Sequence, residues 1–563
     1  MTGKKIAVTI NAQKTGEPIP KYIYGQFIEQ MGRCIYGGIW AEMLEDRKFF
    51  YQPGTKDSPW QIIKPNIIQQ GGLGLIRGKT YVGRIAVSAK NKTKIQISLI
   101  CNEQRQTKTF DVKNCDFGTF NFKFKSTVDT NDGKFEIAYH NKVRINAVSL
   151  MPGDNVKGMR ADTLKLLKEL NAPIYRWPGG NFVSGYDWRD GIGDRDKRPP
   201  KKNPAWKGIE LNDFGIDEFM VFCKEIKTEP LIVVNTGFGD ANSAAEEVRY
   251  INIKKKYNVK WWGVGNEMYG KWQLGHMPLE QYIVKHNLFA RKMREVDPSI
   301  KLIAVGEAGP WSEEMLKNCV ENMDLISEHF YCMEEKENVT EHAEQVPQAI
   351  GKKTAAHREY RKNLKSLKGK DIRIALDEWN YWYGDHIFGE LGTRYYLKDA
   401  LGIAEGLHEM FRNSDLIEMA NYAQTVNVIG AIKTNKTAAE IETTGLVLQL
   451  YRNQFGTIPV EITGDTNSLD VTAALTKNHK ALTIAIVNPT AKNYSFAMKL
   501  KNAKLTGKGQ VWIISHSDPM AFNDPGKEPV VAIAEKKLSG ISGTFDISPL
   551  SVCLYKLEVK NGM

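Results

Sequence analysis

The sequence lacks the long apolar runs, paired cysteines and one-sided charge that mark several classes of protein. No apolar run approaches the ~18 residues needed to span a bilayer, and the first ten residues contain no hydrophobic signal core. The seven cysteines are odd in number and form no Cys-x-x-Cys pair, which argues against a metal knuckle or a full disulfide framework. The sequence allows one disulfide, between Cys101 and Cys115, but does not require it. We expect no membrane partner, and a protein that is either cytoplasmic or secreted with its leader removed.

Nucleic-acid binding and several common chemistries also lack their sequence signals. The net charge of +12 is mild over 563 residues, and the basic runs 195–202 and 254–256 carry no nucleic-acid motif. Gly-x-Ser-x-Gly, His-Glu-x-x-His and Walker motifs do not occur. The pattern argues against a nucleic-acid partner, a serine or zinc hydrolase of those types, and a nucleotide-binding loop.

What is present is the composition of a large globular protein with several domains. Hydrophobic residues make up 42% and charged residues 25% of the chain. Its length predicts two to four domains. Between residues 55 and 153, short alternating segments separated by turns replace the helical periodicity, which predicts an inserted β-sandwich.

The segments around this insert predict a barrel and a second β domain. From 154 to 456, apolar strands alternate with amphipathic helices, close to eight times, which favours an α/β fold of the (β/α)₈ TIM-barrel type that begins in 20–54. Expected helices include Ala41–Arg47 and 353–366. From 457 to 563 the β pattern returns and predicts a C-terminal β-sandwich, joined by an N-terminal strand within 1–19.

Two apolar strands end in carboxylates within tryptophan-rich surroundings. Trp261–Val264 leads through Gly265 to Asn266 and Glu267, and 373–376 leads to Asp377, Glu378 and Trp379. A single glutamate at a strand end is more often a solvated carboxylate, but two in matching contexts are harder to ascribe to chance. Because glycoside hydrolysis uses a pair of carboxylates, we predict that Glu267 and Glu378 form such a pair in the barrel.

Other polar and aromatic side chains stand near predicted strand ends. Arg176 and Asn181 flank a Pro-Gly-Gly turn, where an arginine can pair with a carboxylate and an asparagine can bind sugar hydroxyls. Taken singly, each candidate is more often structural than functional. The remaining candidates are Glu29, His329, Tyr331 and Gln424, which end apolar runs, and Trp206 and Trp382, which can stack on a sugar ring.

The combination of motifs resembles glycoside hydrolase family 51, the retaining α-L-arabinofuranosidases, over most of residues 20–455. The motifs are Tyr24-Gly25-Gln26-Phe27-Ile28-Glu29, Gly32–Trp40, Arg176–Tyr186, Gly265-Asn266-Glu267-Met268, the 275–276 Gly-His pair and Asp377-Glu378-Trp379-Asn380. Family members commonly have His where this chain has Gln26 and Gln30, and Tyr in place of Trp177. The 55–153 insert is absent from the compact members and is similar to the carbohydrate-binding-type β domain of longer ones.

The resemblance implies an eight-stranded barrel with a β-sandwich, and neither a metal nor another cofactor. It implies that Glu267 is the acid/base and Glu378 the nucleophile. It also implies that the sugar is held by Glu29, Arg176, Asn181, Asn266, Tyr331 and Gln424, with His329 supporting them and Trp206 and Trp382 shaping the pocket wall.

The implied partners are arabinose-containing plant polysaccharides or oligosaccharides such as arabinan and arabinoxylan, and the family allows a homo-oligomer. Two other readings stay open at this point. One is an endo-β-1,4-glucanase or xylosidase on the same barrel. The other is a non-catalytic carbohydrate-binding protein, against which the presence of both glutamates speaks.

Overall fold

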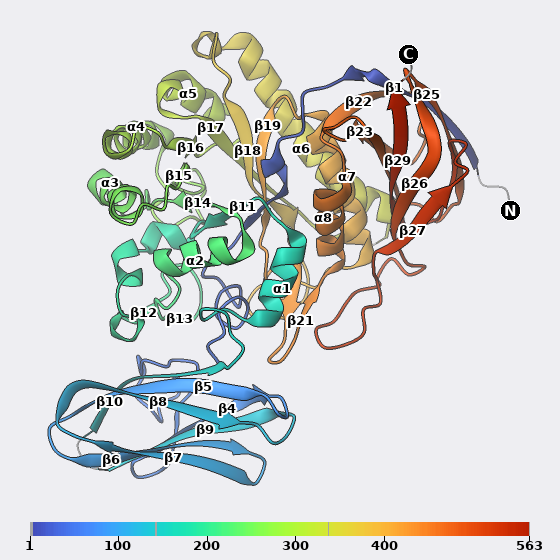
Figure 1. The fold of residues 1–563 in the computed structure, drawn as a ribbon. Coiled ribbons are helices and arrows are strands. Elements are labelled where there is room, and N and C mark those ends of the chain that lie inside the picture. The colour runs from blue at the N-terminus through green and yellow to red at the C-terminus, as the bar shows by residue number, and fades with distance from the viewer. Residues whose placement is uncertain (1–3, 141–142, 336, 562–563) are drawn as a thin grey trace.

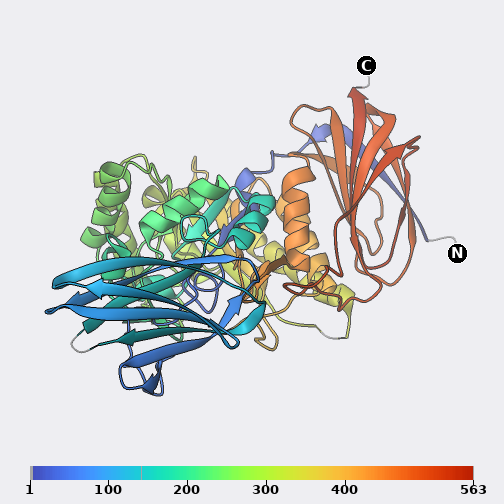
Figure 2. The same ribbon diagram turned by 60° about the horizontal axis from the view of Figure 1, so that its bottom comes forward.

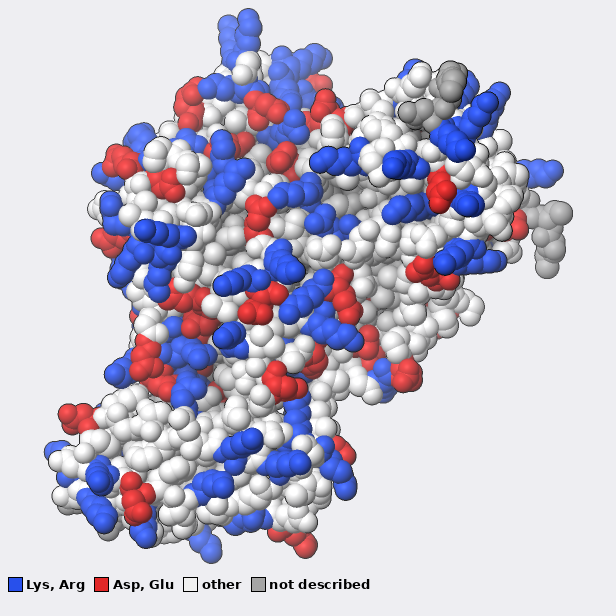
Figure 3. All heavy atoms as spheres, in the orientation of Figure 1, with Lys and Arg blue, Asp and Glu red and all other residues white. Residues whose placement is uncertain are grey.

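A computed structural model describes residues 4–140, 143–335 and 337–561, and shows a closed barrel with two β domains on different sides of it (Figure 1, Figure 2). Within those ranges, no helix is long and apolar enough to cross a membrane. Acidic and basic side chains are interspersed over the face seen in Figure 3.

Eight parallel strands close the barrel in the order β11-β14-β15-β16-β17-β18-β19-β2, which confirms the predicted fold class. Side chains such as Ile174, Leu231, Ile303 and Met419 form one packed cluster inside the barrel, and the alternate strand residues pack outward against the helices. The strands are β2 (Gly25–Phe27), β11 (Ile174–Trp177), β14 (Glu229–Val233), β15 (Trp261–Val264), β16 (Lys301–Ala304), β17 (Leu325–Cys332), β18 (Arg373–Tyr381) and β19 (Ile417–Ala423).

The helices between these strands largely follow the apolar periodicity of the sequence. They are α1 (Ala161–Leu170), α2 (Ile216–Ile226), α3 (Ala241–Val248), α4 (Leu279–Val296), α5 (Pro310–Asn318), α6 (Val339–Asn363), α7 (Leu397–Arg412) and α8 (Thr443–Gln454). Helix α6 begins well before the predicted residue 353, with Asn338 capping its first turn and Pro347 inside it. The helix predicted over Ala41–Arg47 is wrong, since this segment forms an extended stretch and turns.

The insert is a sandwich of two antiparallel sheets with an apolar core of its own. One sheet has the order β10-β5-β8 and the other the order β3-β4-β9-β6-β7. The strands are β3 (Gln61–Lys64), β4 (Ile67–Leu75), β5 (Thr80–Ala89), β6 (Thr93–Cys101), β7 (Gln104–Val112), β8 (Cys115–Lys125), β9 (Thr130–Tyr139) and β10 (Val143–Pro152). Cys101 and Cys115 lie in different sheets as free thiols, so the disulfide considered between them does not form.

The C-terminal β domain has nine strands hydrogen-bonded in the order β27-β26-β29-β24-β23-β22-β1-β25-β28. Its N-terminal member β1 (Lys4–Thr15) pairs with β22 and β25. Phe545 near one edge contacts Tyr555 on β29, with ring centroids 4.3 Å apart, so the sheet folds over its own apolar core. The other strands are β22 (Ile458–Thr463), β23 (Asp470–Leu475), β24 (Ala481–Asn488), β25 (Tyr494–Lys501), β26 (Ala503–Ser515), β27 (Ala534–Ser539), β28 (Thr544–Ile547) and β29 (Ser551–Asn561).

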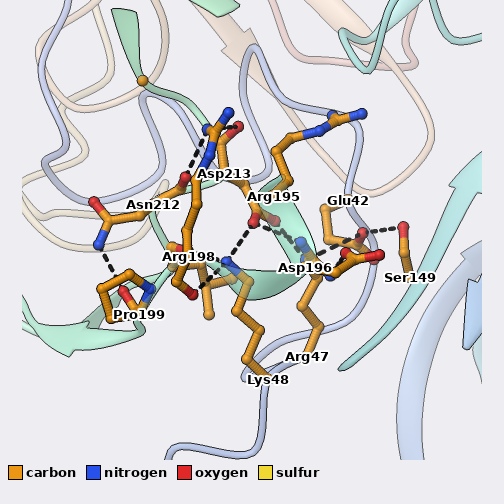
Figure 4. Close-up of polar contacts among 12 residues, drawn as sticks. Glu42, Arg47, Lys48, Ser149, Arg195, Asp196, Arg198, Pro199, Asn212 and Asp213 are labelled. Atoms are coloured by element: carbon orange, nitrogen blue, oxygen red, sulfur yellow. Dashed lines mark hydrogen bonds and ion pairs between the residues drawn. The ribbon is translucent and has the colours of Figure 1, made fainter. Parts of the chain in front are cut away.

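A buried ionic network fastens the insert to the barrel (Figure 4). Arg47, just before the insert, donates to Asp213 through Nε and Nη2 at 2.5 and 2.6 Å and to Asp196 at 2.7 Å. Arg84 on strand β5 of the insert donates to the same Asp196 at 2.6 and 2.7 Å. Lys48 adds an ion pair to Asp213 at 2.9 Å. The network thus joins the stem and body of the insert to the 196–213 segment of the barrel.

Replacing Arg47 by methionine is expected to reduce the free energy of unfolding by about 3–5 kcal/mol. Arg47 and Asp213 are each only 1% exposed, so the variant leaves a buried carboxylate without its main counter-ion. Urea denaturation measures the loss. The control is Arg77→Met, whose ion pair with Asp129 is about 70% exposed on both sides and contributes at most about 1 kcal/mol. Equal denaturation midpoints for the two variants would contradict a structural role for the network.

Candidate active site

The predicted polar residues gather at the carboxyl ends of the barrel strands. Parallel strands place these ends on one rim, where side chains from distant parts of the chain meet. In adjacent strands β17 and β18, His329 pairs in register with Glu378. Arg176 belongs to β11 and Tyr331 to β17, whereas Glu29, Asn266, Glu267 and Gln424 follow strands β2, β15 and β19.

Glu378 is buried and held by two donors. Arg176 Nη1 donates to its Oε1 at 2.8 Å, and the Tyr331 hydroxyl donates to its Oε2 at 2.6 Å. Burial and the neighbouring Glu378 carboxylate raise the pKa of Tyr331 well above its usual value, so its hydroxyl remains a donor. Arg176 also donates to Asn266 Oδ1 at 2.5 Å, which connects the two carboxylate-bearing strand ends. Glu378 is therefore fixed in one orientation.

Glu267 lies at a sharp bend and shares a hydrogen bond with His329. Its φ of 42° lies in the left-handed region, uncommon for a residue with a side chain and frequent at functional sites. His329 Nδ1 lies 2.9 Å from Glu267 Oε1, and Trp272 Nε1 donates to Oε2 at 2.5 Å. Burial raises the pKa of Glu267, but the hydrogen bond and charge of His329, the Trp272 hydrogen bond and the charge of Arg176 together lower it below its usual value.

His329 also connects the two glutamates electrostatically. Its Nδ1 is 3.8 Å from Glu378 Oε1. Burial lowers the pKa of His329, yet the Glu378 and Glu267 carboxylates outweigh burial and raise it above the usual value. The Glu267–His329 pair therefore retains a proton at higher pH than an isolated imidazole does.

Glu29 forms the other side of the site. Its Oε1 accepts from the Trp206 indole at 2.7 Å and from the Phe182 amide at 3.0 Å, and its Oε2 accepts from Gln424 Nε2 at 3.0 Å. Burial and the nearby Glu378 raise the pKa of Glu29 to about 8, so it is largely uncharged at neutral pH. A Cβ at Gly180 would lie 2.2 Å from Glu29 Oε2, so this close approach of the turn requires glycine.

Two predicted sugar-binding residues have other immediate contacts. Asn181 donates to the carbonyl of Trp272 at 2.9 Å and accepts from the amide of Leu274 at 2.8 Å, so its side chain holds the loop after Glu267. Trp382 packs edge-on against Tyr331, with centroids 4.9 Å apart. The structure thus places Asn181 against this loop and Trp382 against the tyrosine that donates to Glu378.

The sequence analysis missed Trp272 and Gln273 in that loop. Trp272 is 65% exposed although its indole donates to Glu267. Gln273 accepts from Asn266 at 2.9 Å and donates to Ser184 at 2.7 Å. The only signal for them in the sequence is a polar loop in which a tryptophan follows Glu267 by five residues.

The spacing of the two carboxylates determines what the site can do. Ligating atoms of Glu267, His329 and Glu378 all lie within 4.8 Å of one another. Such a group can also hold a metal ion, but Arg176 and Tyr331 already direct donors at both oxygens of Glu378. Two close carboxylates at the active rim of a TIM barrel define the protein class as a glycoside hydrolase.

Comparison with known proteins identifies the family. Residues 166–252 match the model of the alpha-L-arabinofuranosidase 1 domain, and 377–551 match that of the alpha-L-arabinofuranosidase C-terminal domain. Alpha-L-arabinofuranosidase C of Emericella nidulans is 31% identical over 444 residues, 68% of this chain and 86% of that protein. The chain belongs to the α-L-arabinofuranosidases of glycoside hydrolase family 51.

Two further comparisons agree with this assignment. Intracellular exo-alpha-(1->5)-L-arabinofuranosidase 1 of Bacillus subtilis is 29% identical over 456 residues, 72% of this chain and 91% of that protein. The arabinose complex of the Thermotoga maritima α-L-arabinofuranosidase has a TM-score of 0.72 at 26% identity, covering 98% of this chain and all of that one. The predicted family, enzyme class and arabinofuranosidase function are confirmed, with arabinose-containing glycans as substrates, and the glucanase or xylosidase reading is not favoured.

Proposed function

We propose that the enzyme is exo-acting and retains anomeric configuration, releasing single terminal α-L-arabinofuranosyl residues from plant polysaccharides or oligosaccharides such as arabinan and arabinoxylan. The observation that carries the proposal is the short distance, within 4.8 Å, between a carboxylate oxygen of Glu267 and one of Glu378. Carboxyl groups about 5–5.5 Å apart are typical of retaining enzymes, whereas inverting enzymes leave about 6.5–9.5 Å for a water molecule.

In the first step, Glu378 attacks the anomeric carbon while Glu267 protonates the departing glycosidic oxygen. The products are the leaving alcohol and an arabinosyl ester of Glu378. In the second step, Glu267 removes a proton from water, which attacks the same carbon and frees Glu378. Arg176 and Tyr331 position Glu378 and balance its charge before and after the ester exists.

His329 explains how a carboxyl with a lowered pKa serves as the acid. The proton that Glu267 delivers is shared with His329 across their 2.9 Å hydrogen bond. As the glycosidic oxygen gains negative charge, Glu267 passes this proton on, which leaves Glu267 as a carboxylate beside a neutral His329 until a proton is taken from water in the second step. Because the pKa of His329 is raised, activity is retained below that value and lost as the pH rises through it.

The stereochemistry of the product tests the proposal. Proton NMR spectra recorded in the first minutes of hydrolysis are expected to show arabinose with the substrate's anomeric configuration, because two inversions cancel. Appearance of the opposite anomer before mutarotation would reject double displacement.

The crowded polar shell supports exo action. Glu29, Arg176, Asn266 and Gln424 are each at most 2% exposed and are joined by hydrogen bonds to one another or to Glu378. These groups can satisfy the hydroxyls of one furanose, but a continuing chain would leave some unpaired, at about 1–3 kcal/mol each. Trp206 binds Glu29 on one side, and Trp382 packs on Tyr331.

Digestion of a branched arabinan tests whether the enzyme is exo-acting. Free arabinose is expected from the first time point, with the backbone length almost unchanged, because the pocket admits only chain ends and side branches. Size-exclusion chromatography of the polymer and chromatography of the sugars follow both quantities. Early oligosaccharides with a rapid fall in polymer size would show an open, endo-acting groove instead.

A further inference from the structure

A large cavity lies between the inserted sandwich and the barrel, outside the shell of Glu29 and the two glutamates. Its volume is about 620 Å³, within the range of about 300–1,000 Å³ typical of small-molecule sites. Barrel segments 32–37, 160–162 and 207–211 line one side, and insert segments 72–76 and 79–81 line the other. The mechanism proposed above uses none of these residues.

The cavity lies on the same side of the barrel as the catalytic glutamates. The insert leaves the barrel after β2 and returns before α1, so it occupies a loop at the carboxyl ends of the strands, on the active side. Gly32 and Arg33 line the cavity and follow Glu29 by three and four residues. Lys207 also lines it and directly follows Trp206, whose indole donates to Glu29. The cavity lining therefore includes residues that are sequence neighbours of Glu29 and of its partner Trp206.

Two sets of contacts hold the cavity walls in place. On one side, the buried Arg47, Asp196 and Asp213 (Figure 4), together with Arg84 on strand β5, fix the insert to the barrel. On another, Gly74 packs against the turn between β20 (Ile432–Thr434) and β21 (Ala439–Ile441), since a Cβ there would lie 2.5 Å from Lys436 Cβ. Lys436 Nζ also donates to the Asn131 carbonyl at 3.1 Å. The cavity is therefore preformed.

The lining suits a neutral ligand rich in hydroxyl groups. Charges of both signs line the cavity, and several compensate one another, as in Arg160–Asp162 at 2.6 Å and Lys79–Asp154 at 3.0 Å. The half-buried Tyr51 offers an aromatic surface. Alternating donors and acceptors beside an aromatic ring match the hydroxyls and apolar ring faces of sugars, whereas a strongly charged ligand would meet no excess of opposite charge.

We propose that this cavity is a second carbohydrate site, which holds a few sugar units of the neutral polysaccharide main chain while a terminal arabinose occupies the catalytic pocket. This inference rests on the proposed function. The site gives the insert a role in polymer binding and leaves the chemical step to the barrel. Single-sugar substrates do not reach it, and branched polymers do.

Replacement of Tyr51 by alanine in the full-length enzyme tests the site. The kcat/KM for a chromogenic arabinofuranoside is expected to stay within about twofold, while that for arabinan falls about fivefold to tenfold, mainly through KM, as loss of one aromatic–sugar contact predicts. The matched control is Tyr139→Ala, a half-buried tyrosine of the same insert that does not line the cavity. It is expected to leave the ratio of the two kcat/KM values unchanged.

A binding measurement separates this inference from the proposed function. Isothermal titration of debranched, linear arabinan oligosaccharides into Glu378→Ala enzyme is expected to show weaker binding when Tyr51→Ala is added. Unchanged polymer kinetics and unchanged binding would overturn the second site while leaving exo hydrolysis intact. An equal loss on both substrates would overturn it as well, since it would assign Tyr51 a purely structural effect. Failure of the wild-type enzyme to release arabinose from either substrate would instead reject the proposed function.

Discussion

Enzyme in which Glu378 is replaced by alanine is expected to retain about a thousandth or less of the wild-type kcat. The substitution removes the oxygen that would form the bond to the anomeric carbon, and no other carboxylate can take its place. Glu267 points at His329 and Trp272, and Glu29 is largely uncharged at neutral pH because its pKa is about 8. The Arg176 guanidinium also loses its closest counter-charge, so the site is less suited to a positively charged transition state.

Added azide distinguishes a lost nucleophile from a damaged fold. In Glu378→Ala, azide occupies the vacated space and attacks the anomeric carbon once, so the expected product is an arabinosyl azide of inverted configuration. The control is Glu418→Ala, which alters a half-buried glutamate at the opposite, amino end of β19 and is expected to leave activity unchanged. A retained azide product from Glu378→Ala would assign Glu378 the acid/base role.

The polar residues at the carboxyl ends of the barrel strands could be predicted, because their place in the site depends only on where each strand ends. Glu29 and Gln424 are 395 residues apart, yet they hydrogen-bond at 3.0 Å since each follows a strand of the same closed barrel. An apolar run followed by a polar residue is visible in the sequence, and parallel strands bring all such ends together. The same rule brings Glu267, His329 and Glu378 within reach of one another.

Contacts made by loops could not be predicted in this way. Asn181 follows a strand end, but its partners are backbone atoms at 272 and 274, in a loop without periodicity. The Ala41–Arg47 segment consists largely of good helix formers, yet tertiary partners override this weak preference. Glu42 accepts from Ser149 at 2.6 Å, and Arg47 binds Asp213, 166 residues away. Such pairs depend on how the insert docks, which local sequence does not encode.

Replacing Glu267 by alanine is expected to give a loss that depends on the leaving group. With arabinan, whose departing alcohol needs a proton, the rate is expected to fall about 10²–10⁴-fold. With an activated phenyl arabinofuranoside, the first step needs little protonation, so the arabinosyl-enzyme forms and accumulates because no base activates water. A burst of phenol followed by slow turnover, measured by stopped-flow absorbance, would show this directly.

Azide rescue and the pH dependence of activity then test whether Glu267 is the acid/base. Azide needs no general base and is expected to accelerate turnover of the Glu267→Ala arabinosyl-enzyme, giving a product of retained configuration after two displacements.

The wild-type fall in activity as pH rises through the raised His329 pKa is expected to vanish in Glu267→Ala with the activated substrate, since no proton is then delivered. The matched control is Glu328→Gln, a neighbouring buried carboxylate that binds His357 at 2.9 Å and Lys353 at 2.9 Å outside the site, and it is expected to keep the wild-type pH profile. An inverted azide product from Glu267→Ala would show instead that Glu267 is the nucleophile and Glu378 the acid.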